Sequence, residues 1–338
     1  MIHVGGIPES YWSGVHLFEG GQCWPPSGAG DRAKFVAALK RHRLLAVAEG
    51  CDTFDASILS SIEQAQREVS DELSRSTEDF KRTLSKIGEV LHRGDWVGIK
   101  GIDFGERLYG GLANRPMNDI DLLLPDKTYP TQLDALERAG FVRQPDSNEL
   151  ETTLEDPETH VIVDVYRAFI QTSRVAIDYD LIFRTAVPLT ESMMVMSLPH
   201  ALATRALIMA NQQYTSHLRT YLDLWLLCTN SVDVLAAIEL AKEWRMRRAF
   251  YASISLLAEA IPETRETDWY PACENLLSPS ESRWLHRCVL PDKPMVSLPG
   301  RSLQLWRKFS LIDDWSQRLS FAKSHAKVVT KGYASRQA

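Results

Sequence analysis

Two aspartates separated by a single residue, Asp119 and Asp121, constrain this chain more than any other feature. They open an apolar run at residues 122–124 that predicts a β-strand, and alternate residues of a strand point to the same face. Two carboxylates on one strand face repel each other at neutral pH unless a cation lies between them. Magnesium is the usual cation, because it takes oxygen ligands from one or two carboxylates together with substrate phosphates. The pair therefore predicts a metal site.

A turn that suits a phosphate precedes this pair. An apolar run ending at Lys100 predicts a strand, and residues 102–109 suit a short helix that begins at Gly101. The free N–H groups at a helix start favour anions, and glycine there lets a phosphate approach the backbone. Lys100 would add a point charge, and Arg115, four residues before Asp119, a bidentate guanidinium. The alternative is that Lys100 and Arg115 only neutralise the acids.

A third carboxylate, Asp164, stands alone among valines in an apolar segment at residues 161–165. An acid in the middle of a strand is costly if it is buried without a partner. If this strand lies beside the strand at 119–124, three carboxylates converge. That arrangement suits phosphoryl or nucleotidyl transfer, in which two acids hold the metal and the third places a second metal or accepts a proton. The simpler alternative is an ion pair with Arg167.

Several motifs around these acids resemble those of a known family. They are Lys100-Gly101, Leu108-Tyr109 and Arg115-Pro116-Met117-Asn118-Asp119-Ile120-Asp121-Leu122-Leu123-Leu124. They resemble the signature of an uncharacterised bacterial nucleotidyltransferase family within the DNA polymerase β-like superfamily. The resemblance implies an α+β fold, a small mixed sheet flanked by helices and followed by an all-helical domain. It also implies that Gly101 is the phosphate-turn glycine, that Asp119 and Asp121 are the metal pair, and that Asp164 is the third acid.

The resemblance extends more weakly into the second half of the chain. Arg219 and Asp223 resemble that family's Arg–Asp helix, although their four-residue spacing is most simply an intrahelical ion pair. The turn also departs from the family, because Gly101-Ile102 stands where Gly-Ser or Gly-Gly is usual. After the third acid, a Val-Tyr pair ending at Tyr166 replaces the family's His-Trp.

Hydrophobic periodicity divides the chain into three parts. We expect an irregular arm at 1–30, a nucleotidyltransferase domain with N-terminal helices at 31–195, and a helical domain at 196–338. The apolar stripe at 55–91 predicts one long helix or two joined near 74–77, and self-association through it as a coiled coil is an alternative. The other expected elements are helices at 31–50, 129–139, 200–213, 217–228, 232–244, 247–260, 280–289 and 312–324, and strands beginning near 141 and 150.

Composition narrows the partners and the compartment. The formal net charge of -6 gives no global basic field of the kind that binds nucleic acid. The five cysteines are scattered without a CxxC pair, which is typical of reduced thiols in a cytoplasmic protein. We expect no membrane span, because no run of 18 apolar residues occurs, and no secretory signal, because the N-terminus lacks a basic segment followed by an apolar one.

Together these features predict an enzyme that uses magnesium, or manganese, to transfer a nucleoside monophosphate. The donor would be an NTP, the acceptor a hydroxyl or phosphate, and the by-product pyrophosphate. The acceptor is expected to be a small molecule, a peptide or a protein rather than RNA, since phosphate contacts need Lys and Arg. The alternatives are a toxin-like nucleotidyltransferase acting on RNA or protein and a non-catalytic nucleotide-binding regulator. The residues expected to hold the metal are Asp119, Asp121 and Asp164, and those expected to bind the triphosphate are Lys100, Gly101 and Arg115.

Overall fold

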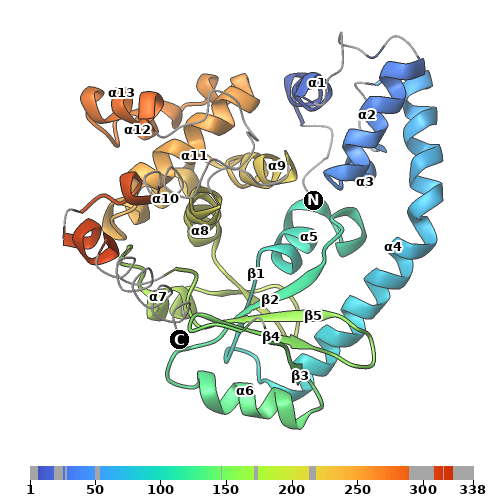
Figure 1. The fold of residues 1–338 in the computed structure, drawn as a ribbon, viewed down its shortest axis with the longest axis vertical. Helices are drawn as coiled ribbons and strands as arrows, with labels where there is room; N and C mark the ends of the chain where they lie inside the picture. The colour runs from blue at the N-terminus through green and yellow to red at the C-terminus, as the bar shows by residue number, and fades with distance from the viewer. Residues whose placement is uncertain are drawn as a thin grey trace, which may run out of the picture.

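A seven-stranded mixed sheet lies between helix α6 and a layer of helices in the computed structural model (Figure 1). The strand order is β3-β4-β5-β2-β1-β7-β6; β2 runs parallel to β5 and antiparallel to β1. The strands are β1 Val97–Ile99, β2 Asp119–Leu123, β3 Val142–Arg143, β4 Glu151–Glu155, β5 Ile162–Tyr166, β6 Val187–Pro188 and β7 Met194–Val195. The structure describes residues 7–18, 26, 29–49, 54–145, 147–170, 174–212, 218–288, 308–314 and 316–322.

Helices precede, interrupt and follow the sheet. The first group is α1 Glu9–Phe18, α2 Ala29–Arg41, α3 Leu45–Glu49 and α4 Ala56–Val90. Between the strands come α5 Gly101–Tyr109, the short 3-10 helix η2 Leu112–Asn114, α6 Tyr129–Arg138 and α7 Tyr179–Arg184. The last group is α8 Leu198–Asn211, α9 Leu218–Leu227, α10 Ser231–Glu243, α11 Arg247–Ala260, η3 Pro262–Glu266, α12 Tyr270–Glu274 and α13 Pro279–Cys288. The expected α+β fold, with a mixed sheet flanked by helices and then a helical region, is confirmed.

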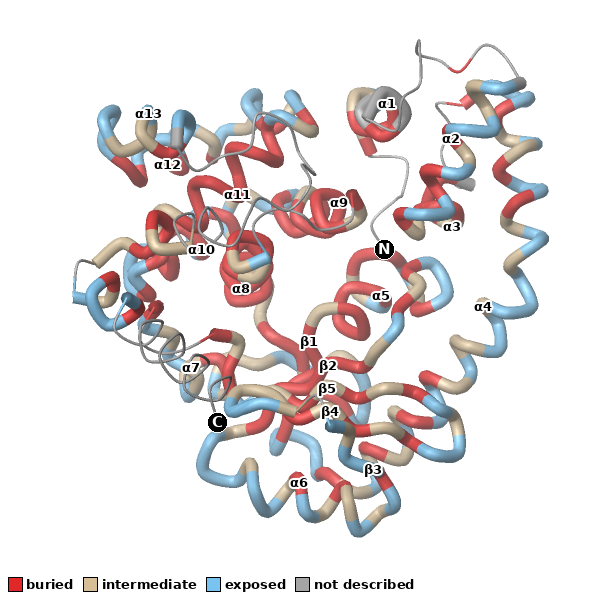
Figure 2. Tube along the Cα trace, in the orientation of Figure 1, coloured by how far each residue is buried: buried red, intermediate tan, exposed pale blue. Residues whose placement is uncertain are grey.

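The two faces of the sheet pack against different helices. Side chains alternate along β2, so Ile120 and Leu122 enter a core with α6 and the end of α4. Leu123 of β2 and Ile99 of β1 face the other way, into a core that continues through α8, α9 and α11. Asp119 and Asp121 share this second face, because they alternate with Ile120 and Leu122. The acids therefore lie on the face of the sheet that packs toward α8, α9 and α11. Figure 2 shows these helices on one side of the strands.

Helix α4 is one continuous helix of 35 residues, roughly 52 Å long at 1.5 Å per residue. Asp55 caps its N-terminus by accepting hydrogen bonds from the backbone N–H groups of Ser57 and Ile58. The first turns of α4 pack against α2 and α3, whereas its last turns pack beside the sheet and α6 (Figure 1). The helix thus connects the N-terminal helices to the sheet, and the alternative of two helices joined near 74–77 is wrong.

Some sequence predictions differ from the structure. The arm expected to be irregular contains helix α1, which is held by buried Tyr11 and Trp12; Tyr11 donates a hydrogen bond to the Leu218 carbonyl oxygen at 3.1 Å. The helix expected at 31–50 is divided into α2 and α3, because Arg43 has φ 58°. Strands β6 and β7 and helix α7 were not predicted, since two-residue strands carry no readable periodicity.

The end of the chain is described only in part. Residues 316–322 are helical, within the helix expected at 312–324, whereas residues 312–314 are not helical, so that prediction begins too early. Residues 315, 323 and 324 of the prediction lie outside the described residues. Among the described helices, none is by itself long and apolar enough to cross a membrane. One pair, Leu218–Leu227 with Ser231–Glu243, passes that test jointly but is bent by 108°.

Candidate active site

The three predicted acids meet at the surface of the sheet. Asp121 is directly paired with Asp164 in the parallel register of β2 and β5, and Asp119 lies two residues before Asp121 on the same face. One carboxylate oxygen from each of the three lies within 4.8 Å of the others. The structure therefore brings together the acids that the sequence left forty-three residues apart.

Burial and mutual repulsion strain this cluster of charges. Burial raises the pKa of Asp119, and the charge of Asp121 raises it further. Burial raises the pKa of Asp164 to about 6, although a hydrogen bond from the Thr153 hydroxyl at 2.9 Å works in the opposite direction; Glu151 and the other two acids add to the rise. The raised pKa values of Asp119 and Asp164 indicate that the three ionised carboxylates would be stabilised by a cation between them.

Lys100 provides a cation on one side of the cluster. Its Nζ donates to Asp121 Oδ1 at 2.6 Å and to the Tyr166 hydroxyl at 2.9 Å, and it lies 4.2 Å from the centre of the Tyr166 ring. Tyr166 is the residue that stands where the resembling family has Trp, so this departure provides a second anchor for Lys100. Arg167 pairs with Asp126, so the alternative ion pair between Arg167 and Asp164 is wrong.

The turn between β1 and α5 is tightly packed. Lys100 adopts φ 51° and ψ -111°, an uncommon backbone conformation for a residue other than glycine, directly before the first residue of α5. A Cβ atom at Gly101 would lie 3.2 Å from Arg115 Nη1 and closer still to Met117 Sδ. Glycine is needed here because two side chains from the segment before β2 fill the space of a Cβ.

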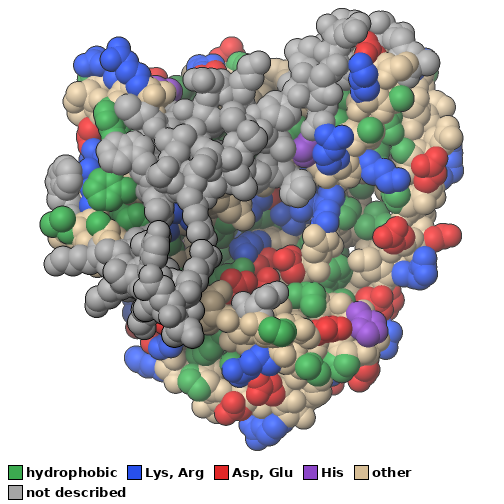
Figure 3. Space-filling model, in the orientation of Figure 1, with side chains coloured by type: hydrophobic (Ala, Val, Ile, Leu, Met, Phe, Trp, Pro, Cys, Tyr) green, Lys and Arg blue, Asp and Glu red, His purple; other side chains and the backbone are tan. Residues whose placement is uncertain are grey.

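A cleft of about 410 Å³ opens over Asp119 and Asp121. Its lining includes Lys100 and Gly101 on the sheet side and seven other polar or cationic side chains that reach in from helices and loops. Figure 3 shows acidic side chains gathered beside Lys and Arg side chains in the hollow at the centre of one face. These seven polar and cationic residues are Arg43, Arg115, Asn118, Arg205, Gln212, Arg219 and Thr220.

A buried carboxylate, Asp223 of α9, organises the helical side. It accepts hydrogen bonds from Arg115 at 2.8 and 3.0 Å, from the Tyr109 hydroxyl at 2.8 Å, and from Arg205. Burial by itself would raise the pKa of Asp223, but Arg115 and Arg205 outweigh burial and hold it well below the ordinary value. The intrahelical pair expected between Arg219 and Asp223 is not among the ion pairs of the described residues; the partners of Asp223 come instead from α5, from α8 and from the segment before β2.

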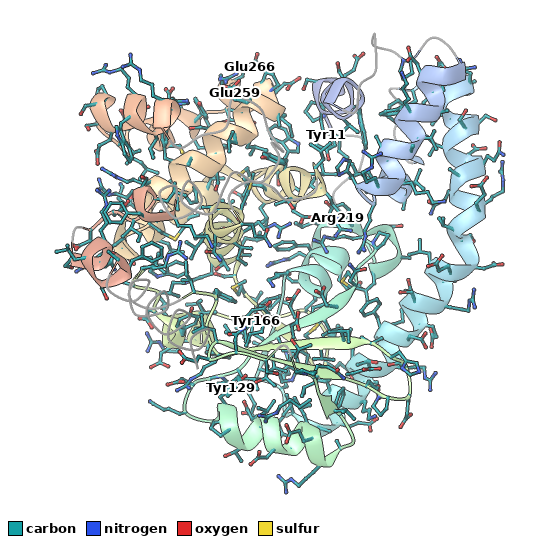
Figure 4. All side chains as sticks on the ribbon, viewed as in Figure 1. Tyr11, Tyr129, Tyr166, Arg219, Glu259 and Glu266 are labelled. Carbon is teal, nitrogen blue, oxygen red and sulfur yellow. The ribbon has the colours of Figure 1, made fainter. Side chains whose placement is uncertain are left out.

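Two arginines fix the segment that leads into the metal pair. Arg219 donates to the Pro116 carbonyl oxygen, and Arg43, from the corner between α2 and α3, donates to Asn118 Oδ1. Asn118 immediately precedes Asp119, so Arg219 holds the backbone, and Arg43 a side chain, of the segment that leads to this carboxylate. Figure 4 shows Arg219 on the helical side of the molecule and Tyr166 on the sheet side.

Sequence reasoning missed two of the cleft arginines. Arg43 lies 76 positions before Asp119 and carries no motif, and Arg205 lies in a helix that reads as plain core. In the described residues, the Nε atom of Arg205 is buried without a hydrogen-bond partner. A buried donor without a partner at the wall of a cleft fits an anionic ligand. No spacing rule would have found these two residues, because only the tertiary fold brings them to the cleft.

The donor set fits a divalent metal ion. Asp119, Asp121 and Asp164 offer three carboxylates, the oxygen ligands that magnesium takes in proteins, and the arginines opposite suit substrate phosphates. This geometry is consistent with a metal-binding catalytic site on a mixed sheet.

Comparison with known proteins gives the family. The model of an uncharacterised nucleotidyltransferase family matches residues 29–262, more than half of the chain, and the chain belongs to that family. It is therefore a transferase with a nucleoside triphosphate as substrate. A search of the curated proteins found no match.

Proposed function

We propose that this enzyme transfers a nucleoside monophosphate from an NTP to a hydroxyl or phosphate acceptor, with magnesium bound by Asp119, Asp121 and Asp164. The observation that carries the proposal is the convergence of three carboxylates within 4.8 Å, beneath a cleft whose other wall is rich in arginine. Bound magnesium would neutralise the charge that develops on the transferred phosphate and orient the triphosphate.

The arginine wall and the turn at Lys100 bind and orient the triphosphate in this proposal. Lys100, Gly101 and Arg115, the residues expected to contact phosphate, all line the cleft, and Arg43, Arg205 and Arg219 lie on the same cavity. Arg115 and Arg205 are fixed in place by Asp223, so their charges are preorganised rather than mobile. Preorganised cations need little rearrangement when the phosphates enter.

The transfer itself is a substitution at the α-phosphorus. The acceptor oxygen forms a bond to that phosphorus, the bond to the bridging oxygen breaks, and pyrophosphate leaves with the electron pair. Asp164 takes the proton of an attacking hydroxyl in this proposal, since it has a single hydrogen bond, from Thr153, among the described side chains. Asp119 and Asp121 would remain ligands of the metal during this step.

We also propose a compartment and an acceptor class. Cys228 and Cys273 are buried free thiols, which supports the cytoplasm as the place of action. The net charge of -6 supports a small molecule, a peptide or a protein as acceptor rather than RNA.

Incubation of the purified protein with each labelled NTP, magnesium and fractions of cell lysate tests the proposal. We expect labelled product and pyrophosphate in the presence of magnesium, and neither with EDTA or in Asp119→Ala. Magnesium-dependent NTP binding without turnover on any fraction would favour a non-catalytic regulator. Label on RNA would favour the toxin-like alternative, and no magnesium-dependent NTP binding would reject the proposal.

A further inference from the structure

A second cavity, of about 280 Å³, lies beside the cleft. Its walls come from the end of α2, from α3, from the middle of α4 and from the segment that leads into β2. Apart from Arg43, no residue that lines this cavity has a part in the proposed binding of NTP or metal. Its position is nevertheless informative, because part of its wall is shared with the cleft.

The middle of α4 leaves an apolar stripe half-covered. Buried residues of α4 occur in its first turns, up to Ala65, and again from Phe80 onward, but none lies between them. Val69 and Leu73 continue the stripe in that interval and line the cavity, each with intermediate exposure. Figure 2 shows this interval of α4 as a strip of exposed and intermediate positions between two buried ends. Two apolar side chains on a cavity wall gain stability when an apolar group covers them.

The cavity and the cleft share part of their walls. Arg43, Met117 and Asn118 line both spaces, and Arg43 donates a hydrogen bond to Asn118 there. Asn118 immediately precedes Asp119, so the shared wall lies next to the first residue of the metal pair.

The charge of the cavity is predominantly positive. Lys40 and Arg43 line it at the end of α2, whereas its acidic lining residue is Glu72. Lys40 is exposed, in the last turn of α2. A small anion that also has an apolar part would match both the cations and the stripe of α4.

We propose that this cavity binds the acceptor substrate, a small amphiphilic anion whose hydroxyl reaches the metal pair past Asn118. Its anionic group lies near Lys40 and Arg43, and its apolar part covers Val69 and Leu73. The cavity volume of about 280 Å³ suits a small molecule and is too small for a folded partner. This assignment rests on the proposed nucleotidyl transfer.

Filling the cavity from α4 tests the assignment. Leu73→Trp places an indole in the cavity, and Ser74→Trp places the same group on the outer face of the same turn as a matched control. We expect Leu73→Trp to lower labelled transfer into the low-mass fraction of a lysate at least tenfold while magnesium-dependent NTP binding stays as in the wild type. Ser74→Trp should match the wild type in both assays.

A variant that changes only a charge tests the same assignment without altering how the side chains of the cavity pack. Lys40→Glu changes an exposed residue and should weaken binding of the anionic apolar probe 8-anilinonaphthalene-1-sulfonate about fivefold or more; Leu73→Trp should weaken it further. Lys34→Glu, exposed on the same helix and outside the cavity, is the control. Probe binding that neither Lys40→Glu nor Leu73→Trp alters would overturn the assignment.

Three other outcomes also overturn it. The first is labelled product that Leu73→Trp still makes at the wild-type rate, and the second is label found only in the macromolecular fraction. The third is a wild-type dimer that Leu73→Trp dissociates. That result would show that the apolar stripe of α4 is covered by a second copy of the chain. Failure of the proposed function is distinguishable, because the wild type itself would then yield no labelled product.

Discussion

The two walls of the cleft are built on opposite principles. On the sheet wall, three like charges crowd together, and among the described side chains their hydrogen bonds come from Lys100 and Thr153 alone. On the helical wall, like charges also gather, but a buried carboxylate of α9, Asp223, compensates two of the arginines. The sheet wall is thus incomplete without a cation, whereas on the helical wall a buried carboxylate already pairs with two of the arginines and holds them in place. Neutralising one charge on each wall should therefore have opposite consequences.

The largest effect is expected on the sheet wall. Asp119→Asn should lower labelled transfer about a thousandfold or more, since a bound metal supplies several kcal/mol of transition-state stabilisation. Its thermal stability should stay the same or rise, because the substitution relieves repulsion from Asp121. Calorimetry with magnesium and a thermal melt measure the two effects. A variant that melts much lower than the wild type would contradict the idea of an incomplete wall.

Asp223→Asn should do the reverse. It leaves Arg115 and Arg205 buried without a compensating charge, and breaking a buried pair in this way costs about 3 kcal/mol or more in the free energy of unfolding. Urea denaturation measures the loss, and Asp126→Asn, which removes the exposed partner of Arg167, is the control and should cost under about 1 kcal/mol.

The effect of Asp223 on stability also has a definite pH dependence. The pKa of Asp223 is depressed in the folded protein, so its stabilisation is present above the unfolded pKa of about 3.9 and is lost only as the pH falls toward the folded value. The difference in stability between the wild type and Asp223→Asn should therefore be constant from about pH 5 to 8. A difference that shrinks with falling pH across that window would show that Asp223 is not held ionised by its arginines.

Arg43→Gln should produce a smaller, purely functional change. The substitution removes a cleft cation and the hydrogen bond to Asn118, and we expect NTP affinity to fall roughly tenfold, about 1.4 kcal/mol. Stability should change little because the bond is exposed. Binding of a labelled NTP measures the effect, with Arg67→Gln on the outer face of α4 as the control. Equal NTP affinities for Arg43→Gln and the wild type would show that Arg43 does not contact the triphosphate.

Gly101→Ala is expected to lower the free energy of unfolding by only about 1 kcal/mol, because the flexible side chain of Met117 can yield to a Cβ. Gly101 lines the cleft, so the KM for NTP tells whether the residue also serves the triphosphate. A raised KM with unchanged kcat would place the triphosphate at this turn. A loss of stability of several kcal/mol with unchanged KM would instead make Gly101 a packing residue only.

Sequence reasoning succeeded where the signal was local. The Asp119-x-Asp121 spacing, the strand character around Asp164 and the long stripe of α4 depend on alternation along one segment, which a reader of the sequence can follow. It failed for α1, because burial of Tyr11 and Trp12 against distant helices, rather than a helical period, orders that segment. It also failed for β6 and β7, whose pairing with each other and with β1 is a tertiary matter.

The sequence by itself determined which side chains could hold a metal and that Asp119 and Asp121 would share one face of a strand, since strand alternation is a property of the covalent chain. The pairing of β5 with β2, which brings Asp164 to them, is tertiary. Tertiary structure decided what faces them. Arg43 and Arg205 reach the cleft because helices far apart in the chain pack over one sheet. For the same reason Asp223 forms ion pairs with Arg115 and Arg205 rather than with Arg219. Charges interact through space, so the partners of a carboxylate follow from packing and not from spacing in the sequence.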